Sequence, residues 1–202
     1  MANICSSQYC FYSRNAQSLS AFRKSLISVT RFNDDYHTYD LGWMGYMVEE
    51  YIPEKSEDIR YRGNVEDIGE IFSISSELIG FNVWAESAWV PVIKMWDLVL
   101  KKCFPDISFS CIGEELGCGV FVKYDKINYY CDRYILDVFD EGIDYFSELK
   151  SIICVLKEKY NISVADSADV DQINNQLKCA DGESFALVTE VEIIEDGDFE
   201  CF

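Results

Sequence analysis

The chain has 202 residues, of which 36 are Asp or Glu and 17 are Lys or Arg, so its formal net charge is −19. Hydrophobic residues at 49% and aromatic residues at 15% exclude a disordered chain, and no apolar run approaches the roughly 18 residues of a membrane helix. Because no basic residue precedes an apolar stretch at the start, a secretory signal is not expected, and we predict a cytoplasmic protein with its own core.

The first third of the chain predicts a strand, a helix and an irregular insertion. Ile4–Tyr12 is rich in aromatic residues and cysteine, which favours a strand. Asn15 suits the start of a helix whose apolar residues recur at helical spacing. From about residue 31 to 67 turn residues and acids interrupt any pattern, apart from a short helix predicted at Met44–Tyr51.

The middle third predicts a hairpin, a helix and another strand. Ile68–Ser75 and Ile79–Ala85 alternate apolar and polar residues, and few residues join them. Pro91 suits the first turn of a helix that ends before Pro105. Apolar and polar residues alternate again over Ile107–Cys111, which predicts a strand.

The last third predicts a β meander followed by helices and a final strand. The aromatic-rich runs Val120–Tyr124 and Ile127–Phe139 read as meander strands. The helical spacing from Phe146 to Tyr160 is the clearest in the chain, and a second, short helix is expected from Ser167. Side chains alternate over Glu183–Ile194, which predicts a final strand with one face formed by Phe185, Leu187, Thr189, Val191 and Ile193. A frayed acidic tail is expected to follow this strand.

The order of these elements predicts an α+β fold. The first six elements follow the split βαββαβ order of a ferredoxin-like sandwich, an antiparallel sheet with its helices on one face. We therefore predict a ferredoxin-like core over residues 1–139 with an insertion at 31–67. Residues 140–202 are expected to form a C-terminal extension of a helix, a short helix, a strand and the tail, packed on the same domain.

Cysteine and histidine usage limits the possible chemistry. The chain has nine cysteines and no C-x-x-C, so neither a zinc ribbon nor a thioredoxin-type site is expected, and the thiols are predicted to be reduced and mostly structural. The single histidine, His37, excludes a His-rich metal site. Walker A, G-x-G-x-x-G, G-x-S-x-G and H-E-x-x-H motifs are all missing, and no cofactor or metal is predicted.

Charge is distributed unevenly along the chain. Residues 1–33 contain four basic residues and no acid, whereas residues 181–202 contain eight acids and no Lys or Arg. Such an acidic surface repels phosphate backbones and anionic lipid, so we expect neither direct nucleic-acid binding nor membrane binding. The acids form either a solvated face or a patch that binds a basic protein or mimics nucleic acid.

Four short clusters supply candidate site residues, and each also has a structural explanation. Two tryptophans and Glu86 surround the predicted strand-to-helix junction, where Trp89 can instead staple the helix start. The paired Glu114 and Glu115 precede Gly117, a pattern that suits acid–base work or a solvated turn, although adjacent strand residues point to opposite faces. The candidate pocket comprises Arg62, Trp84, Glu86, Trp89, Glu115, Gly117 and Arg133.

The two arginines among these candidates are basic groups in an acidic chain. Arg62 can meet Glu86 or Glu115 across the sheet, and a pair of this kind is structural at least as often as catalytic. Arg133 follows Asp132, with which it can form a local ion pair worth under about 1 kcal/mol if exposed.

A series of short motifs resembles a known family. They occur in the order Met1-Ala-Asn-Ile-Cys-Ser, Arg62-Gly-Asn-Val, Ser87-Ala-Trp-Val-Pro91, Phe104-Pro105, Glu114-Glu-Leu-Gly-Cys-Gly119 and Asp132-Arg-Tyr134. Over roughly residues 1–135 the chain thereby resembles the Api92-like, YubB-type ferredoxin-like family of plasmids, phages and gut-bacterial mobile elements. The resemblance implies the fold and a bacterial cytoplasmic setting, and it supplies no catalytic residues. In this chain Ile4 replaces the tryptophan of the family's usual opening Asn-Trp-Cys.

The expected function is that of a non-enzymatic binding or accessory protein of a bacterial mobile element. Its aromatic and acidic surfaces would contact a protein partner with a basic surface. Two alternatives stay open at this point: a small-molecule binder or enzyme with a Trp/Glu/Arg pocket, and a mimic of nucleic acid. The sequence predicts neither the ligand nor the oligomeric state.

Overall fold

The computed structural model describes residues 3–30, 42–55, 57, 59–139, 141–178 and 184–199. His37 and the first part of the expected insertion lie outside these ranges. The chain divides into two compact units: the first comprises residues 1–129 and 193–202, and the second comprises residues 130–192. Each unit is described separately below.

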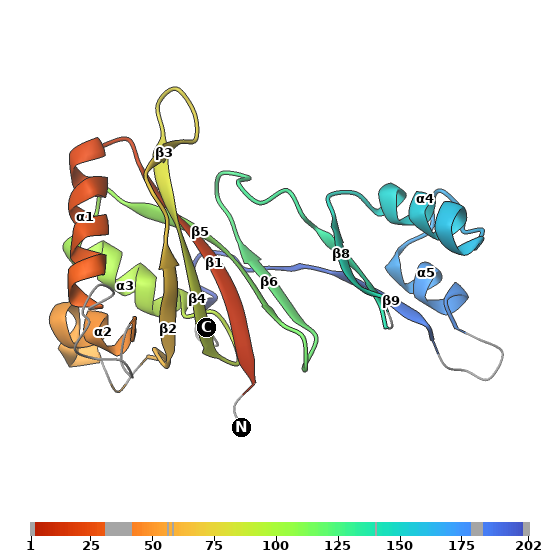
Figure 1. Cartoon of the computed structure of the whole chain (residues 1–202), viewed down its shortest axis with the longest axis horizontal. Helices are drawn as coiled ribbons and strands as arrows, with labels where there is room; N and C mark the ends of the chain where they lie inside the picture. Colours follow the sequence, from red (N-terminus) through yellow and green to blue (C-terminus); the bar gives the residue numbers. More distant parts are fainter. Residues whose placement is uncertain are drawn as a thin grey trace. The chain divides into compact units, whose positions relative to one another are not determined.

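The first unit contains a seven-stranded sheet and three α-helices (Figure 1). Its helical elements are α1 (Ala16–Val29), α2 (Gly45–Tyr51), the 3-10 turn η1 (Pro53–Lys55) and α3 (Ile93–Cys103). Its strands are β1 (Ile4–Ser13), β2 (Gly63–Ile68), β3 (Phe72–Ser73), β4 (Ile79–Ala88), β5 (Ser108–Glu115), β6 (Val120–Tyr124) and β10 (Glu192–Ile193). The strand order is β10-β6-β5-β1-β4-β2, with β3 paired to β4.

The central strand β1 pairs antiparallel with both β4 and β5, and its alternating side chains define two faces of the sheet. On one face Tyr9 lies opposite Val83 on one side and Cys111 on the other, and all three are buried. Helices α1 and α3 cover this face, since Phe11 contacts the rings of Phe22 and Trp96. The residues between these core positions therefore project from the other face.

Local signals position the helices as predicted. The Asn15 side chain accepts hydrogen bonds from the N–H groups of Gln17 and Ser18, at 3.1 and 3.2 Å, and so caps α1. The predicted helix at Met44–Tyr51 is confirmed as α2. The helix predicted after Pro91 is α3, which buries Met95, Trp96 and Val99.

The strand predicted at Ile68–Ser75 is wrong in its bounds. The sheet strand β2 occupies Gly63–Ile68, inside the expected insertion, and only the two residues of β3 lie in the predicted range. A shift of register between Val65 and Asp67 inserts an extra residue in β2, so the buried residues Val65 and Ile68 stand three apart. The insertion therefore contributes to the core, because α2 also buries Met47 and Val48.

The second unit contains a three-stranded sheet, β8-β7-β9, and two helices. Its elements are β7 (Tyr134–Val138), β8 (Gly142–Phe146), α4 (Leu149–Tyr160), α5 (Val170–Gln176) and β9 (Ala186–Glu190). Leu136, Val138 and Val188 project from one face of the sheet and pack with Ile152 and Ile173 of the helices. Asn161 ends α4 in the left-handed conformation with φ 56°, as expected of a C-cap asparagine.

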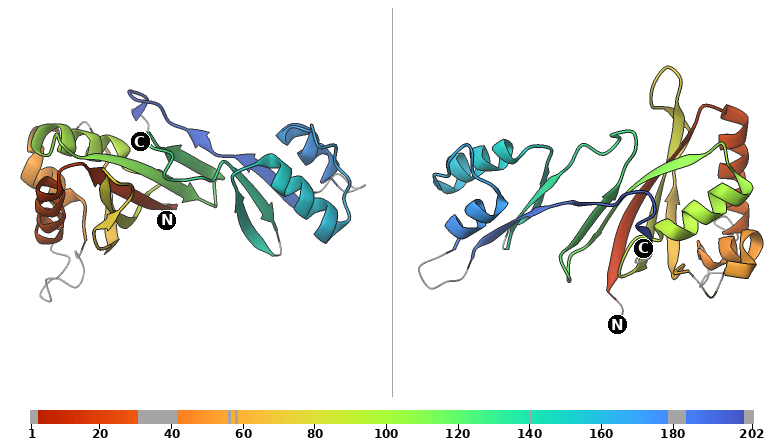
Figure 2. Two further views of the ribbon diagram at one scale, coloured as in Figure 1. Left: turned by 90° about the horizontal axis from the view of Figure 1, so that it is seen from above. Right: turned by 180° about the vertical axis from the view of Figure 1, so that it is seen from behind.

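The division of the chain differs from the expected one in two respects. The boundary falls at residue 130 rather than 140, and the run Ile127–Phe139, predicted as part of a β meander of the core, contains β7 of the second unit. The last described residues also return to the first unit (Figure 2), where Ile194 and Phe199 are buried in its core. Of the segment expected to be a frayed acidic tail, residues 195–198 are exposed, but Asp196 pairs with Lys126 at 2.7 Å and Phe199 is buried in the first core.

Candidate functional site

The register of the first sheet separates the candidate residues. Trp84 and Glu86 alternate with the buried residues Val83 and Ala85, so they project from the face away from the helices, and both are exposed. Glu115 follows the parity of the core residue Cys111 and is buried on the helix side. Glu86 and Glu115 thus lie on opposite faces, and the sheet does not bring them into one pocket.

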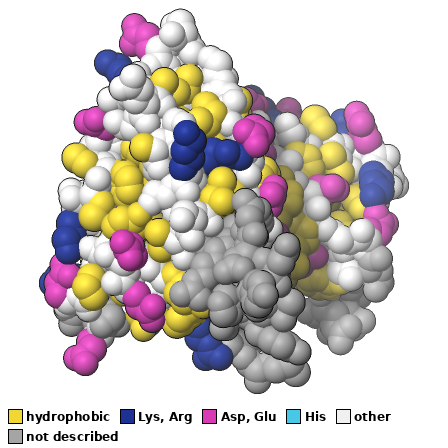
Figure 3. Space-filling view, turned by 60° about the vertical axis from the view of Figure 1, so that its left-hand side comes forward, with side chains coloured by type: hydrophobic (Ala, Val, Ile, Leu, Met, Phe, Trp, Pro, Cys, Tyr) yellow, Lys and Arg dark blue, Asp and Glu magenta, His cyan; other side chains and the backbone are white. Residues whose placement is uncertain are grey.

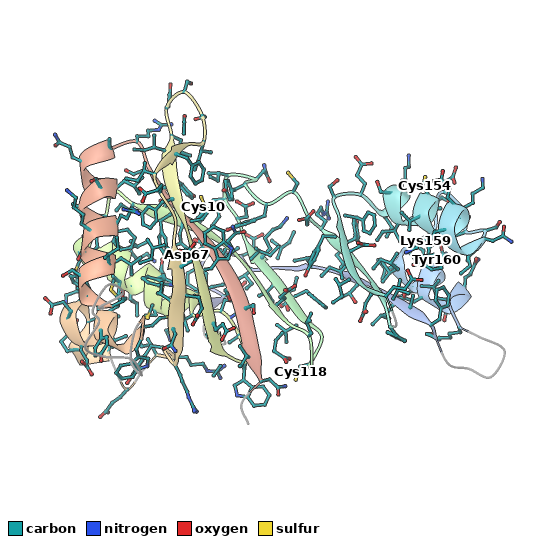
Figure 4. All side chains as sticks on the ribbon, in the orientation of Figure 1. Cys10, Asp67, Cys118, Cys154, Lys159 and Tyr160 are labelled. Atoms are coloured by element: carbon teal, nitrogen blue, oxygen red, sulfur yellow. The ribbon has the colours of Figure 1, made fainter. Side chains whose placement is uncertain are left out.

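The uncovered face presents two rows of side chains that cross the sheet from strand to strand. The first row runs through Asn64, Glu86, Ser6, Glu114 and Phe121. The second row runs through Asp67, Trp84, Gln8, Ile112 and Lys123. We call these ten residues the sheet platform. Trp84 is a large hydrophobic side chain of the sheet platform and is 40% exposed. Asp67, labelled in Figure 4, lies at the end of the platform formed by β2.

The extra residue of β2, Glu66, lies beside the sheet platform and near the platform residue Glu86. Partial burial and, to a smaller extent, the nearby charge of Glu86 raise the pKa of Glu66. A cationic group placed beside these two carboxylates would offset the charge repulsion but not the effect of burial.

The end of the sheet beside Asn3 brings together a second set of residues. The N–H of Trp89 donates to the carbonyl of Asn3 at 3.0 Å, and the side-chain amide of Asn3 donates to Cys118 Sγ at 2.9 Å. Asn3 thus lies beside two predicted site residues, Trp89 and Gly117. Its side-chain nitrogen is 3.7 Å from the position that a Cβ atom would occupy at Gly117. Large hydrophobic side chains are exposed here: Ile4, Trp89 and Leu116.

Trp89 has a strained backbone. Its φ is 73°, and the N–H of Val90 donates to the carbonyl of Ala88 at 3.0 Å, which closes a three-residue turn around Trp89. A left-handed conformation is unfavourable for a residue with a Cβ by about 1–2 kcal/mol. The turn holds the half-exposed indole at the junction between β4 and α3.

We predict that this strain is measurable by comparing two substitutions of the same residue. Trp89→Gly should be more stable than Trp89→Ala by about 1 kcal/mol, because glycine adopts positive φ without penalty and this gain exceeds its greater freedom in the unfolded chain. Urea denaturation followed by circular dichroism measures the difference. The same pair at Val90, which has no positive φ, should have the opposite order of stability. Equal stabilities at position 89 would contradict the strain.

Glu115 organises the β5–β6 turn rather than a reactive site. Its carboxylate accepts hydrogen bonds from the N–H groups of Gly117, at 3.0 Å, and Cys118, at 2.5 Å. Cys118 lies at the tip of this hairpin (Figure 4). A hydrogen bond to Glu115 raises the pKa of the Cys118 thiol, with smaller contributions from desolvation and from the charge of Glu115. A thiol held in its neutral form is a poor nucleophile.

We expect Glu115→Gln to increase the alkylation rate of Cys118 several-fold at pH 8, since loss of the carboxylate charge lowers the thiol pKa. Reaction with iodoacetamide followed by peptide mass spectrometry gives the rate at each cysteine. Cys154, which is exposed in the second unit, provides the reference rate within each sample. An unchanged rate at Cys118 would show that Glu115 does not control this thiol.

The two candidate arginines lie in different units. Arg62 is exposed just before β2, where its carbonyl accepts from the N–H of Ala88 at 3.0 Å. Arg133 belongs to the second unit and pairs with Glu190 at 3.2 Å, with both side chains about half exposed. A surface pair of this kind contributes about 1 kcal/mol or less, so the structure favours a local role for Arg133.

A cavity of about 230 Å³ beside α3 contains none of the predicted residues. Leu100, Ile107 and Phe109 form apolar walls, and Lys101 and Lys126 lie at the rim. Each lysine already pairs with a carboxylate, Lys101 with Asp97 at 2.8 Å and Lys126 with Asp196 at 2.7 Å. The two positive charges at the rim of the cavity are therefore balanced by carboxylates of the first unit.

Metal-binding groups and buried thiols are two features of the described residues that bear on their chemistry. They contain no group of three or more His, Cys, Asp or Glu side chains placed to hold a metal ion. Burial raises the pKa of the Cys5 thiol to about 11 and that of Cys10 to about 12, so neither is a thiolate at neutral pH. None of the helices in the described ranges has the length and apolar character needed to cross a lipid bilayer.

Surface charges on the face of Figure 3 are mixed rather than segregated. Acidic side chains alternate there with basic and hydrophobic ones. Several acids of the first unit are also paired, as Glu70 is with Arg23 at 2.7 Å and Glu54 with Lys102 at 2.8 Å. On this face the acids do not form the continuous row that mimicry of a phosphate backbone requires.

Sequence reasoning missed the strand-to-strand partners that complete the sheet platform. Gln8 and Ile112 belong to no motif, and Ser6 occurs only at the end of the opening family motif, so only the register places these residues on one face with Trp84 and Glu86. Similarity to characterised proteins adds no further assignment: neither a family model, nor a curated protein, nor a solved structure matches this chain.

Proposed function

We propose that this chain is a non-enzymatic binding protein that contacts a protein partner with a basic surface. The observation that carries the proposal is the sheet platform, where an exposed tryptophan stands among carboxylates on a face that the helices leave uncovered. The proposal includes the role expected from the sequence, an accessory protein of a bacterial mobile element acting in the cytoplasm.

Trp84 has the properties of an interface anchor. Tryptophan is enriched among residues that dominate binding energy, because it buries a large apolar area with few rotatable bonds. Next to it Gln8 offers both hydrogen-bond donors and acceptors, and Ile112, one strand further along the row, is partly exposed. An apolar centre with a charged rim is the usual anatomy of a protein interface.

Charge at the rim favours a basic partner and disfavours nucleic acid. Glu66, Asp67, Glu86 and Glu114 surround the aromatic centre, and the pKa of Glu66 is raised by partial burial and then by the charge of Glu86. Aromatic sheet faces in other folds stack the bases of single-stranded RNA, but they combine stacking with basic groups that attract phosphate. Here the four acids outnumber the one basic residue of the platform, the buried Lys123, so Lys or Arg side chains are the favoured contacts.

We also propose that the first unit is a ferredoxin-like sandwich of the Api92-like type. The order β5-β1-β4-β2 supports this assignment, because it places the four strands of a βαββαβ unit in an antiparallel sheet with α1 and α3 as the crossovers. Strands β6 and β10 extend that sheet. The ordered short motifs between Met1 and Tyr134 supply the family component of the proposal.

Site-specific crosslinking followed by affinity measurement tests the partner. A photoreactive amino acid at Ser6, in the middle of the sheet platform, should trap the partner in bacterial cells, whereas the same group at the exposed helix residue Gln17 should not. With the purified partner, Trp84→Ala should weaken binding at least about tenfold, equivalent to about 1.4 kcal/mol. Glu86→Gln should weaken it less and reduce its dependence on salt.

Two outcomes would contradict this function. One is equal crosslinking from Ser6 and Gln17, which would place contacts outside the platform. The other is a Trp84→Ala variant that binds within about twofold of the unsubstituted chain. Leu116→Ala, which removes an exposed side chain from the end of the sheet, is the control for unspecific loss of apolar surface.

A further inference from the structure

Both edges of the first sheet are closed among the described residues. At the β2 edge the N–H of Val65 donates to the carbonyl of Gly42 at 2.7 Å, and the N–H of Met44 donates to the carbonyl of Gly63 at 3.0 Å. At the other edge β10 has only two residues. Covering segments and very short edge strands are two means by which proteins prevent unwanted strand pairing.

The β9 edge of the second sheet is closed by a side chain. The amide of Asn174, on α5, donates to the carbonyl of Val188 at 2.8 Å and accepts from the N–H of Val188 at 2.8 Å. These two hydrogen bonds occupy the backbone groups that an added strand would use at the centre of β9. Three of the four sheet edges are therefore blocked.

The fourth edge, β8, has β7 as its hydrogen-bonded neighbour and ends the sheet on its other side. The N–H and carbonyl of Val188 point to Asn174 and therefore away from β7. Its register partner Leu136 consequently directs its N–H and carbonyl toward β8, where Leu136 lies opposite Asp144. Asp144 thus bonds to β7, and the adjacent Ile143 directs its N–H and carbonyl to the outer edge. A strand added here would meet correctly oriented backbone groups.

The side chains beside this edge define what kind of segment fits. On the face away from α4 and α5, Ile143 and Leu187 lie on either side of Asp137, and Tyr145 lies in the next row beside Ile135. Tyr145 and Leu187 are 41% and 44% exposed, so apolar and acidic side chains are mixed on this face. Residues 130–192 contain 14 Asp and Glu against 5 Lys and Arg. A segment with alternating apolar and basic side chains matches both properties, whereas a second copy of this chain would add the same acidic surplus.

We propose that β8 binds an extended, basic segment of a partner protein as a fourth antiparallel or parallel strand of the second sheet. Main-chain hydrogen bonds would supply affinity, and alternate side chains would supply specificity, as in other cases of strand addition. This inference goes beyond the sheet platform, since it concerns the other unit and other residues. Failure of one proposal leaves the other unaffected.

Amide hydrogen exchange on the full-length chain tests the proposal with two short peptides. One alternates valine with lysine and is kept below the concentration at which it self-associates; the other has glutamate in place of lysine. The lysine peptide should slow exchange at the Ile143 N–H at least about tenfold, as expected when an edge amide enters a ladder. The glutamate peptide should leave the exchange rate unchanged.

Matched charge substitutions locate the binding edge. Ile143→Lys should weaken binding of the lysine peptide at least about tenfold, because it places a like charge on the strand that pairs with the peptide. Leu187→Lys introduces the same change on the same face but beside the edge that Asn174 closes, and it should weaken binding less than about threefold. Circular dichroism of both variants verifies that the fold is retained.

A proline substitution provides the second variant. Ile143→Pro removes the outward N–H and should weaken binding of the lysine peptide at least about tenfold, while β7 and β9 remain paired. Lack of protection at Ile143 with the lysine peptide would overturn the proposal, as would equal protection by the glutamate peptide. A dimer of the chain that Ile143→Lys dissociates would also overturn it, because the occupant would then be a second copy.

Discussion

Phe11→Ala is expected to lower the free energy of unfolding of the first unit by about 3–5 kcal/mol. Phe11 is fully buried in the central strand β1 and lies at the centre of an aromatic cluster. Its ring centroid lies between 5.0 and 6.1 Å from those of Tyr9, Phe22, Phe81, Trp96 and Phe109. Removing it leaves a cavity between the sheet and both crossover helices, and rings on separate elements cannot close that space without moving the helices.

Tryptophan fluorescence during urea denaturation measures this loss selectively. All four tryptophans, at positions 43, 84, 89 and 96, belong to the first unit, and the second unit contains none. Leu116→Ala, which truncates a 58% exposed side chain in the same unit, should change stability by less than about 0.5 kcal/mol. A Phe11→Ala variant as stable as Leu116→Ala would mean that the ring cluster contributes little to the fold.

The elements with strong local signals could be predicted from the sequence. Helices α1, α3 and α4 carry apolar residues at helical spacing, and the asparagines at positions 15 and 161 mark an N-terminal and a C-terminal cap. Each signal depends on residues within one or two turns. The chain order of these elements was sufficient to predict an α+β fold.

Strand β2 could not be predicted, because its bulge breaks the two-residue alternation. With an extra residue at Glu66, the buried residues Val65 and Ile68 are three apart, and acids occupy the positions between them. The alternation of apolar residues therefore predicts the strand in the next segment along the chain, Ile68–Ser75. The bulge becomes visible only through the pairing of β2 with β4.

The alternation of the C-terminal run does not show which of its faces is buried. Phe185, Leu187 and Ile193 are larger than their neighbours, yet Ala186 and Val188 are the buried residues of β9, and Val191 after it is buried as well. Ala186 and Val188 pack with Ile173 in the second core, so tertiary packing outweighs side-chain size here. Single-sequence patterns contain no information about the space on either side of a strand.

The candidate site could be predicted only within single segments. The spacing of two between Trp84 and Glu86 correctly indicates one shared face, and the adjacency of Glu114 and Glu115 indicates opposite faces. The sheet platform, however, combines residues from five strands, and Gln8 meets Trp84 across 76 positions of sequence only because β1 pairs with β4. Contacts of this kind follow from register, which short motifs do not encode.

Ile194→Ala is expected to destabilise the first unit by about 2–5 kcal/mol, although it lies 65 residues beyond Tyr129, where that unit's main segment ends. Ile194 is 5% exposed within the first core, and its N–H donates to the carbonyl of Lys123 at 2.8 Å. The chain thus leaves the first unit, forms the second, and returns to add β10 beside β6. Loss of the buried side chain weakens this closing contact.

The adjacent Ile193 provides a matched control, because it is 52% exposed and the substitution removes the same atoms. Ile193→Ala should change stability by less than about 0.5 kcal/mol in the same fluorescence assay. A large difference in stability loss between the two substitutions requires that the returning segment has a fixed register in the sheet. A frayed tail has no such register. Equal and small effects of the two substitutions would instead mean that residues 193–199 do not belong to the first core, and that the second unit is a terminal extension rather than an insertion.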